Sequence, residues 1–486
     1  MSGEILVVPK NAQGHLFPCM ELCKQLLRHG AVCKITLLVD SDVASSVPSS
    51  LAESPLFKVM DLSASLSPKP QGSPPGRQYD VLARGIEAVL ANSDPESGRP
   101  SCAIVDHIMH RSQAVFAKFG IPTVTFITSG ACWAAVQHAA WAVRPGDMRP
   151  GEVRHLPGLP DGMVLSYSDL QQRRHWMTPR RGSGGEPPEA AKVGSRPQMM
   201  MGPPLPGQPA PWVEEVKNSA AILINTSDAL ERPFIDYMVD LIGKPIWGIG
   251  PLLPEQYWRS SESLFREREI RPKRESNYTD DEIIAWLDKQ PPRSVIFVSF
   301  GSEVGPSAEE YPELAMALEE LAQSFPFIWV IQRKSGPGQP EGAYFPHGLE
   351  GRVSQRGLVV HGWAPQLLIM SHPSTGGFVS HCGWNSTVEA IVRGVPILAW
   401  PIRGDQYYNA KLVASYLRVG EMVAEGYPEA RVEKRDIGKG IQKVLCDEEI
   451  RRRSMELKVK FEGGLPESSI TSLEAFIREL ILKKSS

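Results

Sequence analysis

The chain has 486 residues, a length typical of two or three domains. It carries 52 Lys and Arg residues against 55 Asp and Glu residues, a net charge of −3. This near balance argues against a nucleic-acid binder held by bulk charge and against a polybasic membrane anchor. Charged residues make up 22% and apolar residues 42% of the chain, which describes an ordinary globular protein and excludes a disordered one.

The cysteine pattern indicates a reducing compartment. The seven cysteines are scattered and form no CxxC pair, which argues against a disulfide framework and a structural zinc site. Cys19 and Cys23 are expected to be buried apolar thiols. The apolar run from Ile5 to Pro9 is too short for a signal peptide, and no run is long enough to span a membrane. We therefore expect a cytoplasmic protein with no membrane insertion.

The first half of the chain alternates between strand and helix patterns. Residues 4–8 form an apolar run typical of a buried parallel strand, and PKNAQGH after it predicts a turn. The segment FPCMELCKQLLRHG has helical spacing, with Pro18 expected in the first turn and Gly30 ending the helix. Strands are expected over 31–39 and 101–106 and through PTVTFIT, with a helix through QAVFAKFG. This alternation predicts a doubly wound parallel sheet.

Two stretches of the chain lack periodicity. Residues 172–210 are rich in Pro, Gly and charge, and we interpret them as a mobile surface insertion, as filler rather than a lid over a substrate. The segments 220–231 and 244–252 still resemble strand material of the same half. Residues 259–280 are therefore the better candidate for a linker between domains.

The second half of the chain restarts the alternation. Strands are expected at 294–301 and 327–332 and through GLVVHGW, GFVSHCG and PILAWP, with helices through YPELAMALEELAQS and 384–394. The chain is therefore predicted to form two α/β domains in tandem, which place a ligand cleft at the carboxyl ends of their strands. Polar residues that follow apolar strands are expected at this edge, namely His15, Asp106, Ser302, His381 and Asp405.

The densest chemical signal lies between Trp363 and Gln406. Here the strand GFVS opens into a helix through HCGWNST, and a helix N-terminus of small residues suits a phosphate. Asn385 and Ser386 can add donors to that site, and the Glu389 carboxylate can accept both hydroxyls of a ribose. The alternative is that these residues cap the helix and complement its dipole.

This segment resembles the 44-residue signature of the plant family 1 UDP-dependent glycosyltransferases, with W-A-P-Q, H-C-G-W-N-S-T-x-E, G-V-P and D-Q in order. Further matches are G-H-x-x-P at 14–18, I-N-T-S-D-A-L-E at 224–231 and the run at 285–302 that ends in S-F-G-S. The resemblance implies the GT-B fold, in which two Rossmann-like domains face each other across a cleft. It divides the chain into an acceptor domain at 1–258, a linker at 259–280, a UDP-sugar domain at 281–467, and a helix at 468–486 that returns to the first domain.

The resemblance also implies the donor-binding residues. Trp363 resembles the residue that stacks on uracil, Ala364 the residue that contacts that base through its backbone, and Gln366 and Glu389 the partners of the ribose. The residues that resemble the diphosphate site are Ser302, His381, Asn385 and Ser386. Those that resemble sugar-hydroxyl partners are Trp384, Asp405 and Gln406, and a Gln at the last position suggests UDP-glucose.

His15 resembles the general base of the family, and Asp106 can hold its other ring nitrogen. The implied reaction is a single inverting displacement in which a hydroxyl attacks the anomeric carbon. The family needs no metal or cofactor beyond the donor, and its partners are a UDP-sugar and a small-molecule acceptor. Thr128 sits where relatives carry a Thr near the sugar. We expect a monomer.

The acceptor is the least determined part of the hypothesis. Phe17, Cys19, Ile127, Trp133 and Trp212 are expected to form an apolar acceptor wall, which favours a flavonoid or another phenolic. Attack through carbon and transfer onto an existing glycoside both stay open. Arg403 departs from the apolar or aromatic residues of many relatives, and it either contacts an anionic or sugar-bearing acceptor or points to solvent.

Two functions of other classes are disfavoured. A dinucleotide-dependent oxidoreductase predicts GxGxxG in the first turn, which reads PKNAQGH instead. A non-catalytic nucleotide-sugar binder predicts loss of the base or of its orienting carboxylate, and both are present.

Overall fold

The computed structural model describes residues 3–30, 34–44, 47–62, 76–92, 99–143, 147–170, 210–258, 275–331, 346–424, 426 and 431–482. The predicted insertion at 172–210 lies outside these residues except for its last position, and so do Cys33 and most of the predicted linker at 259–280. The domain limits at 258 and 280 therefore stay predictions. Within the described residues, no helix is long and apolar enough to cross a membrane.

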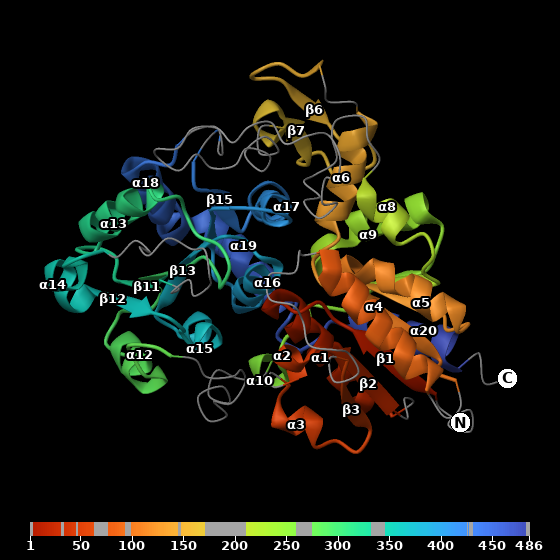
Figure 1. The fold of residues 1–486 in the computed structure, drawn as a ribbon. Coiled ribbons are helices and arrows are strands. Elements are labelled where there is room, and N and C mark those ends of the chain that lie inside the picture. Colours follow the sequence, from red (N-terminus) through yellow and green to blue (C-terminus); the bar gives the residue numbers. More distant parts are fainter. Residues whose placement is uncertain are drawn as a thin grey trace, which may run out of the picture.

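Two parallel sheets dominate the fold (Figure 1). In spatial order, the first sheet holds β3 (Phe57–Asp61), β2 (Lys34–Val39), β1 (Glu4–Val8), β4 (Cys102–Asp106), β5 (Thr123–Ile127), β8 (Ala221–Ile224) and β9 (Ile246–Gly248). The second holds β12 (Gly357–His361), β11 (Phe327–Ile331), β10 (Val295–Ser299), β13 (Thr375–Ser380), β14 (Ile397–Ala399) and β15 (Gly420–Met422). A separate antiparallel hairpin joins β6 (Val153–His155) and β7 (Val164–Ser166).

Helices connect the strands of each sheet. In the first half they are α1 (Gln13–Arg28), α2 (Ser41–Ala44), α3 (Ser49–Ala52), α4 (Gly76–Ala91), the 3₁₀ segment η3 (His107–Ser112), α5 (Gln113–Lys118), α6 (Cys132–Ala142), α8 (Pro211–Glu215), α9 (Asp228–Ile242) and α10 (Glu255–Trp258). In the second half they are α12 (Asp280–Leu287), α13 (Glu310–Leu321), α14 (Leu349–Val353), η5 (Ser354–Arg356), α15 (Gln366–Ser371), α16 (Trp384–Arg393), α17 (Gln406–Lys411), the π-helical turn η6 (Leu412–Leu417), α18 (Lys434–Cys446) and α19 (Glu448–Val459). The chain closes with α20 (Glu467–Phe476) and a second π-helical turn, η7 (Ile477–Leu482).

The sheets have the composition of strands covered on both faces. Every residue of β4, β5, β10 and β11 is buried, and these strands consist largely of branched and aromatic side chains. Such continuous apolar runs are what parallel strands need when helices cover both faces of the sheet. The predicted alternation of strand and helix is therefore confirmed in both halves.

Strand order fixes where a ligand can bind. When the strands of each sheet are numbered in chain order, their spatial order begins 3-2-1-4-5-6 in both sheets. The direction in which successive strands are added therefore reverses between the first and the fourth strand. In the first sheet these strands are β1 and β4, and in the second they are β10 and β13. Helices that follow neighbouring parallel strands leave a crevice beyond the carboxyl ends at this point. His15 follows β1, and Asp106 is the last residue of β4. Ser302 follows β10, and His381 follows β13.

The first helix begins earlier than the sequence predicts. It starts at Gln13, and the Ala12 carbonyl accepts from the backbone N–H groups of His15 and Leu16. His15 therefore lies in the first turn of α1 rather than before it. Pro18 lies inside the helix instead of in its first turn, where it has no N–H to donate to the Gly14 carbonyl.

The last helix packs on the first half of the chain, as predicted. Figure 1 shows α20, in blue, beside the red and orange elements of the N-terminal half. The Ser469 hydroxyl donates to the Gly250 carbonyl at 2.6 Å. The fully buried Phe476 ring lies 5.9 Å from the Trp247 ring, centroid to centroid, and so anchors the end of the helix on β9.

Replacing Phe476 by Ala should lower the free energy of unfolding by about 3–5 kcal/mol, because a fully buried ring is lost and a cavity stays behind. Denaturant unfolding of the whole chain measures the change. Ile470→Ala is the matched control, since that side chain is on the same helix but 45% exposed. Equal losses in the two variants would contradict the packing described for α20.

Candidate active site

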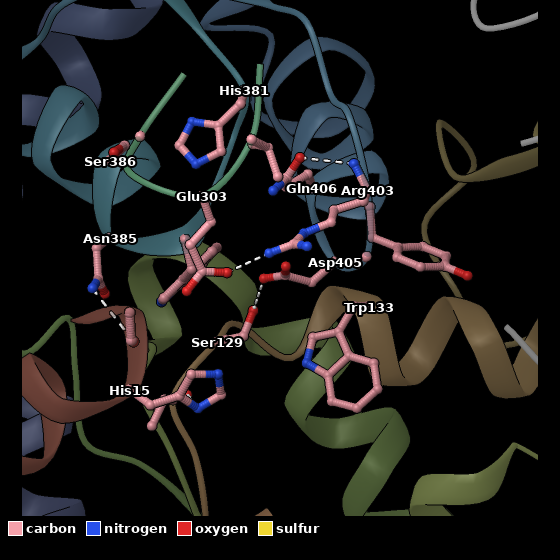
Figure 2. Close-up of a pocket in the computed structure, with 18 of the residues that line it drawn as sticks. His15, Ser129, Trp133, Glu303, His381, Asn385, Ser386, Arg403, Asp405 and Gln406 are labelled. Atoms are coloured by element: carbon pink, nitrogen blue, oxygen red, sulfur yellow. Dashed lines mark hydrogen bonds and ion pairs between the residues drawn. The ribbon is translucent and has the colours of Figure 1, made fainter. Parts of the chain in front are cut away.

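A cavity of about 720 Å³ lies between the carboxyl ends of the two sheets and is lined from both halves of the chain. Of the predicted site residues, its walls include His15, Ser302, Trp363, Ala364, Gln366, His381, Trp384, Asn385, Ser386, Glu389, Asp405 and Gln406. The predicted Asp106 is the exception, because it lies buried behind His15 rather than at the wall. Figure 2 shows His15 and Ser129 on one side of this cavity, facing His381, Arg403 and Gln406 on the other.

His15 and Asp106 form a hydrogen-bonded pair. The His15 Nδ1 atom lies 2.7 Å from Asp106 Oδ2 and 3.0 Å from the Thr128 hydroxyl. The Asp106 side chain is fully buried, whereas the His15 side chain is 21% exposed toward the cavity. Because Nδ1 is engaged on the inner side, Nε2 is the ring nitrogen that can take a proton from a substrate.

The surroundings of Asp106 keep its carboxylate ionised. Burial by itself raises the pKa of this carboxyl, but His15, His107 and the backbone N–H of Ile108 outweigh that effect and hold the pKa below its ordinary value. The Ile108 N–H donates to Asp106 Oδ1 at 3.0 Å. The pair thus has the form of a base and its orienting carboxylate, which fixes the tautomer and stabilises the imidazolium.

His381 is held in a narrow slot between two glycines. A Cβ on Gly301 would lie 2.9 Å from the His381 ring, and one on Gly383 would lie 2.5 Å from Nε2. Burial, followed by the charge of Arg403, lowers the pKa of His381 to about 4. The imidazole is therefore neutral at pH 7. The turn into α16 also places Cys382 at a φ of 60°, a strained conformation of the kind that collects at functional sites.

Gln366, the first residue of α15, contacts two residues of α16, Ser386 and Glu389. The Gln366 Nε2 atom donates to the Ser386 hydroxyl at 3.0 Å and to Glu389 Oε2 at 2.6 Å. Trp363 and Ala364 lie next to Gln366 in the cavity wall. The residues predicted to hold uracil and ribose are thus brought together, although Glu389 is fully buried beneath the surface of this cluster.

The residues predicted to hold the sugar lie across the cavity from His15. The Asp405 Oδ2 atom accepts from the Ser129 hydroxyl at 2.6 Å, a contact between the two halves of the chain. The Gln406 Oε1 atom accepts from the backbone N–H groups of Ile402 and Arg403, which aims its Nε2 as the donor. The Trp384 indole N–H donates to the Asn225 carbonyl at 2.7 Å. The indole N–H is therefore not available to donate to a sugar hydroxyl.

Two further polar pairs cross or flank the cavity. Arg403 forms an ion pair with Glu303, which the sequence analysis does not single out. The Asn385 Nδ2 atom donates to the Gly14 carbonyl at 3.4 Å, and this is the carbonyl that Pro18 leaves without a helical partner. Both pairs are drawn as dashed lines in Figure 2.

The predicted acceptor wall is correct in part. Phe17, Trp133 and Trp212 line the cavity, as expected. Cys19 and Ile127 do not line it, because each is only 1% exposed and packs in the hydrophobic core. His107, missed by the sequence analysis, lines this part of the cavity with its ring 5.5 Å from that of Trp133.

No disulfide joins the cysteines in the described part of the chain. The predicted burial of Cys19 and Cys23 is confirmed. Among the described residues, no group of three or more His, Cys, Asp or Glu side chains could hold a metal ion. The expectation of metal-independent chemistry stays a prediction.

The two buried histidines of the cavity, His107 and His381, should each make the protein less stable as the pH falls from 6.5 to 4, whereas Glu215, whose pKa burial raises to about 7, acts in the opposite direction over this range. Burial lowers the pKa of His107, like that of His381, to about 4, so in this window the unfolded chain binds protons that the folded chain does not. At pH 5 each histidine should reduce the unfolding free energy by about 2 kcal/mol relative to pH 7. His107→Gln should shrink the difference between denaturant unfolding at pH 7 and at pH 5, and the exposed His29→Gln should not. An undiminished difference in His107→Gln would contradict this account.

The sequence of this chain is similar to those of known UDP-dependent glycosyltransferases. The family model described as "UDP-glucoronosyl and UDP-glucosyl transferase" matches residues 274–460. UDP-glycosyltransferase 73C25 of Barbarea vulgaris is 30% identical over 98% of this chain and 96% of its own. Anthocyanin 3'-O-beta-glucosyltransferase of Gentiana triflora is 29% identical over 98% of both chains.

Solved structures agree in fold. A glycosyltransferase of Siraitia grosvenorii in complex with UDP is 25% identical, with a TM-score of 0.74 over 98% of this chain and 99% of its own. A Medicago truncatula enzyme complexed with UDP-glucose is 22% identical, with a TM-score of 0.75 over 99% of this chain and 98% of its own. The chain belongs to the plant family 1 UDP-dependent glycosyltransferases, inverting enzymes of the GT-B fold that transfer a sugar from a UDP-sugar to a small-molecule acceptor.

Proposed function

We propose that this enzyme transfers glucose from UDP-glucose to a hydroxyl of a flavonoid or another small phenolic, with His15 as the general base. The observation that carries the proposal is the placement of the His15–Asp106 pair opposite the N-terminus of α16 across one cavity. A base on one wall and an anion-binding helix end on the other are the two groups that an inverting displacement needs.

The reaction begins with the acceptor hydroxyl. His15 Nε2 takes its proton as the oxygen attacks the anomeric carbon from the face opposite UDP. A carbon–oxygen bond to the acceptor forms, and the bond between the anomeric carbon and the diphosphate oxygen breaks. The proton stays on His15, whose imidazolium is stabilised by the Asp106 carboxylate 2.7 Å away.

The diphosphate leaves with its charge facing the first turn of α16. The free backbone N–H groups there, and the positive end of the helix dipole, stabilise the negative charge. His381 contributes as a neutral donor, because its pKa is lowered to about 4 by burial and by Arg403. Its buried Nδ1 has no hydrogen-bond partner among the described residues. We propose that this site works without a metal, since neutral donors and the helix end face the leaving group.

The proposed donor follows from the sugar end of the cavity. Asp405 can accept from sugar hydroxyls and Gln406 can donate to them through Nε2, a complementary pair for a hexose. The name of the Gentiana triflora relative, a glucosyltransferase, supports glucose. That enzyme is named for its acceptor, an anthocyanin, which supports the flavonoid class, as do the aromatic side chains of Phe17, Trp133 and Trp212 in the wall.

The assay that tests this proposal measures UDP release and product mass. The protein is incubated with UDP-glucose, UDP-galactose, UDP-glucuronate or UDP-xylose and a panel of flavonoids, simple phenols and terpenoid alcohols. Glucosylated flavonoid or phenol should form with UDP-glucose. His15→Ala should reduce kcat at least 100-fold, within the range for loss of a general base.

His29→Ala is the matched control, because His29 lies exposed at the other end of α1 and outside the cavity. It should leave turnover unchanged. Unaltered product yield in His15→Ala would overturn the assignment of the base. Faster turnover with another donor would overturn the assignment of glucose.

A further inference from the structure

The sequence motif I-N-T-S-D-A-L-E lies behind the active site rather than in its wall. Asn225, its second residue, directly follows β8 and is fully buried. It is absent from the cavity lining, so it does not contact a substrate there. Glu231, the last residue of the motif, is also fully buried and lies in the first turn of α9.

All four hydrogen-bonding groups of Asn225 are engaged. Its backbone N–H donates to the Ile127 carbonyl at 2.9 Å, and its Oδ1 accepts from the Leu252 N–H at 2.7 Å. Its Nδ2 donates to the Thr128 carbonyl at 3.1 Å. Its own carbonyl accepts from the Trp384 indole at 2.7 Å. A buried amide with every group satisfied holds its neighbours in one arrangement.

Two of these neighbours belong to opposite sides of the active site. Thr128 places its hydroxyl 3.0 Å from His15 Nδ1, so the position of Thr128 bears directly on the base. Trp384 is the first residue of α16, the helix whose N-terminus lies at the cavity and is the proposed diphosphate site. Asn225 therefore connects the base in one half of the chain to the donor-site helix in the other.

Glu231 fixes the far end of the same loop. Its carboxylate accepts from the backbone N–H groups of Ala131 and Cys132 at 2.7 and 2.8 Å and so caps the start of α6. Between these points, a Cβ on Gly130 would lie 2.5 Å from Glu231 Oε2 and 2.6 Å from the Trp384 ring. The loop from Thr128 to Cys132 is thus held by hydrogen bonds at both ends, and its Gly130 packs closely against the Trp384 ring.

We propose that Asn225 is a positioning residue for the transfer reaction, which sets the His15 imidazole in register with the N-terminus of α16 through Thr128 and Trp384. This inference rests on the proposed role of His15 as the base. It assigns to Asn225 an effect on the chemical step rather than on donor binding, because a displacement requires base, acceptor and anomeric carbon in line.

Asn225→Asp removes the amide that donates to the Thr128 carbonyl but leaves the hydrogen bond from Trp384 to the backbone carbonyl of residue 225. The aspartate keeps an oxygen for the Leu252 N–H and keeps the backbone carbonyl for Trp384, but it has no amide donor for the Thr128 carbonyl. We expect kcat with UDP-glucose and the best phenolic acceptor to fall at least tenfold. The dissociation constant of UDP, measured by calorimetry, should stay within twofold of the original value. A kcat within twofold of the unmodified enzyme would overturn the proposal.

A structural control distinguishes positioning from simple loss of stability. Ser469→Ala removes another buried hydrogen bond, to Gly250, at a site outside the cavity. It should lower the thermal midpoint while leaving kcat unchanged at 25 °C. Equal losses of kcat in Ser469→Ala and Asn225→Asp, at a temperature where both are folded, would show that Asn225 is structural only.

A double-mutant cycle tests whether Asn225 acts through Thr128. Thr128→Val removes the hydroxyl that contacts His15, so Asn225→Asp should cost much less activity in that background than alone. Additive losses would contradict the inference. If Asn225→Asp does not fold, Glu231→Gln tests the position of the same loop, because it replaces one of the two oxygens that accept from Ala131 and Cys132 with an NH2 group.

The outcomes separate this inference from the proposed function. Loss of activity in His15→Ala with full kcat in Asn225→Asp would overturn the positioning role alone. Retained activity in His15→Ala would overturn the proposed base, and with it the route by which Asn225 acts.

Discussion

The whole site depends on the edge that parallel strands share. In both sheets the strands run parallel, so the carboxyl ends of β1 and β4 meet, and those of β10 and β13 meet. Helices packed on each face hold these strands rigidly, since the strands are buried on both sides. Groups far apart in sequence, such as His15 and Asp106, are thereby fixed within hydrogen-bonding distance.

Because the cavity lies between two such edges, the two halves of the chain must also be aligned with each other. A buried apolar cluster runs without interruption from Trp133 in the first half to Phe297 in the second, and apolar burial sets no precise alignment by itself. Directional bonds supply the alignment: Trp384 to Asn225, Ser129 to Asp405, and Tyr257 to the Glu389 carbonyl. These bonds lie next to residues of the cavity wall, and an in-line attack there would require the two halves to be closely aligned.

The sequence predicts the fold and the motif residues well because their signals are local. Continuous apolar runs identify the strands, and the cavity collects every residue of the 363–406 segment that was singled out as a ligand contact. Ser129 was not predicted, and Asn225 was recognised only as part of a motif and was given no role. Each meets a partner more than 150 residues away, Asp405 and Trp384, and nothing in the local pattern marks such pairs. Cys19 and Ile127 were misplaced for the opposite reason, since an apolar residue near a motif suits a core as well as a cavity wall.

The central claim is that His15 faces the acceptor oxygen while α16 faces the diphosphate. A crystal structure with the unreactive donor UDP-2-fluoroglucose and a phenolic acceptor tests it most directly. The account predicts an acceptor oxygen about 2.6–3.2 Å from His15 Nε2 and in line with the anomeric carbon and its leaving oxygen. An acceptor hydroxyl bound to another side chain, or a diphosphate bound away from the first turn of α16, would contradict it.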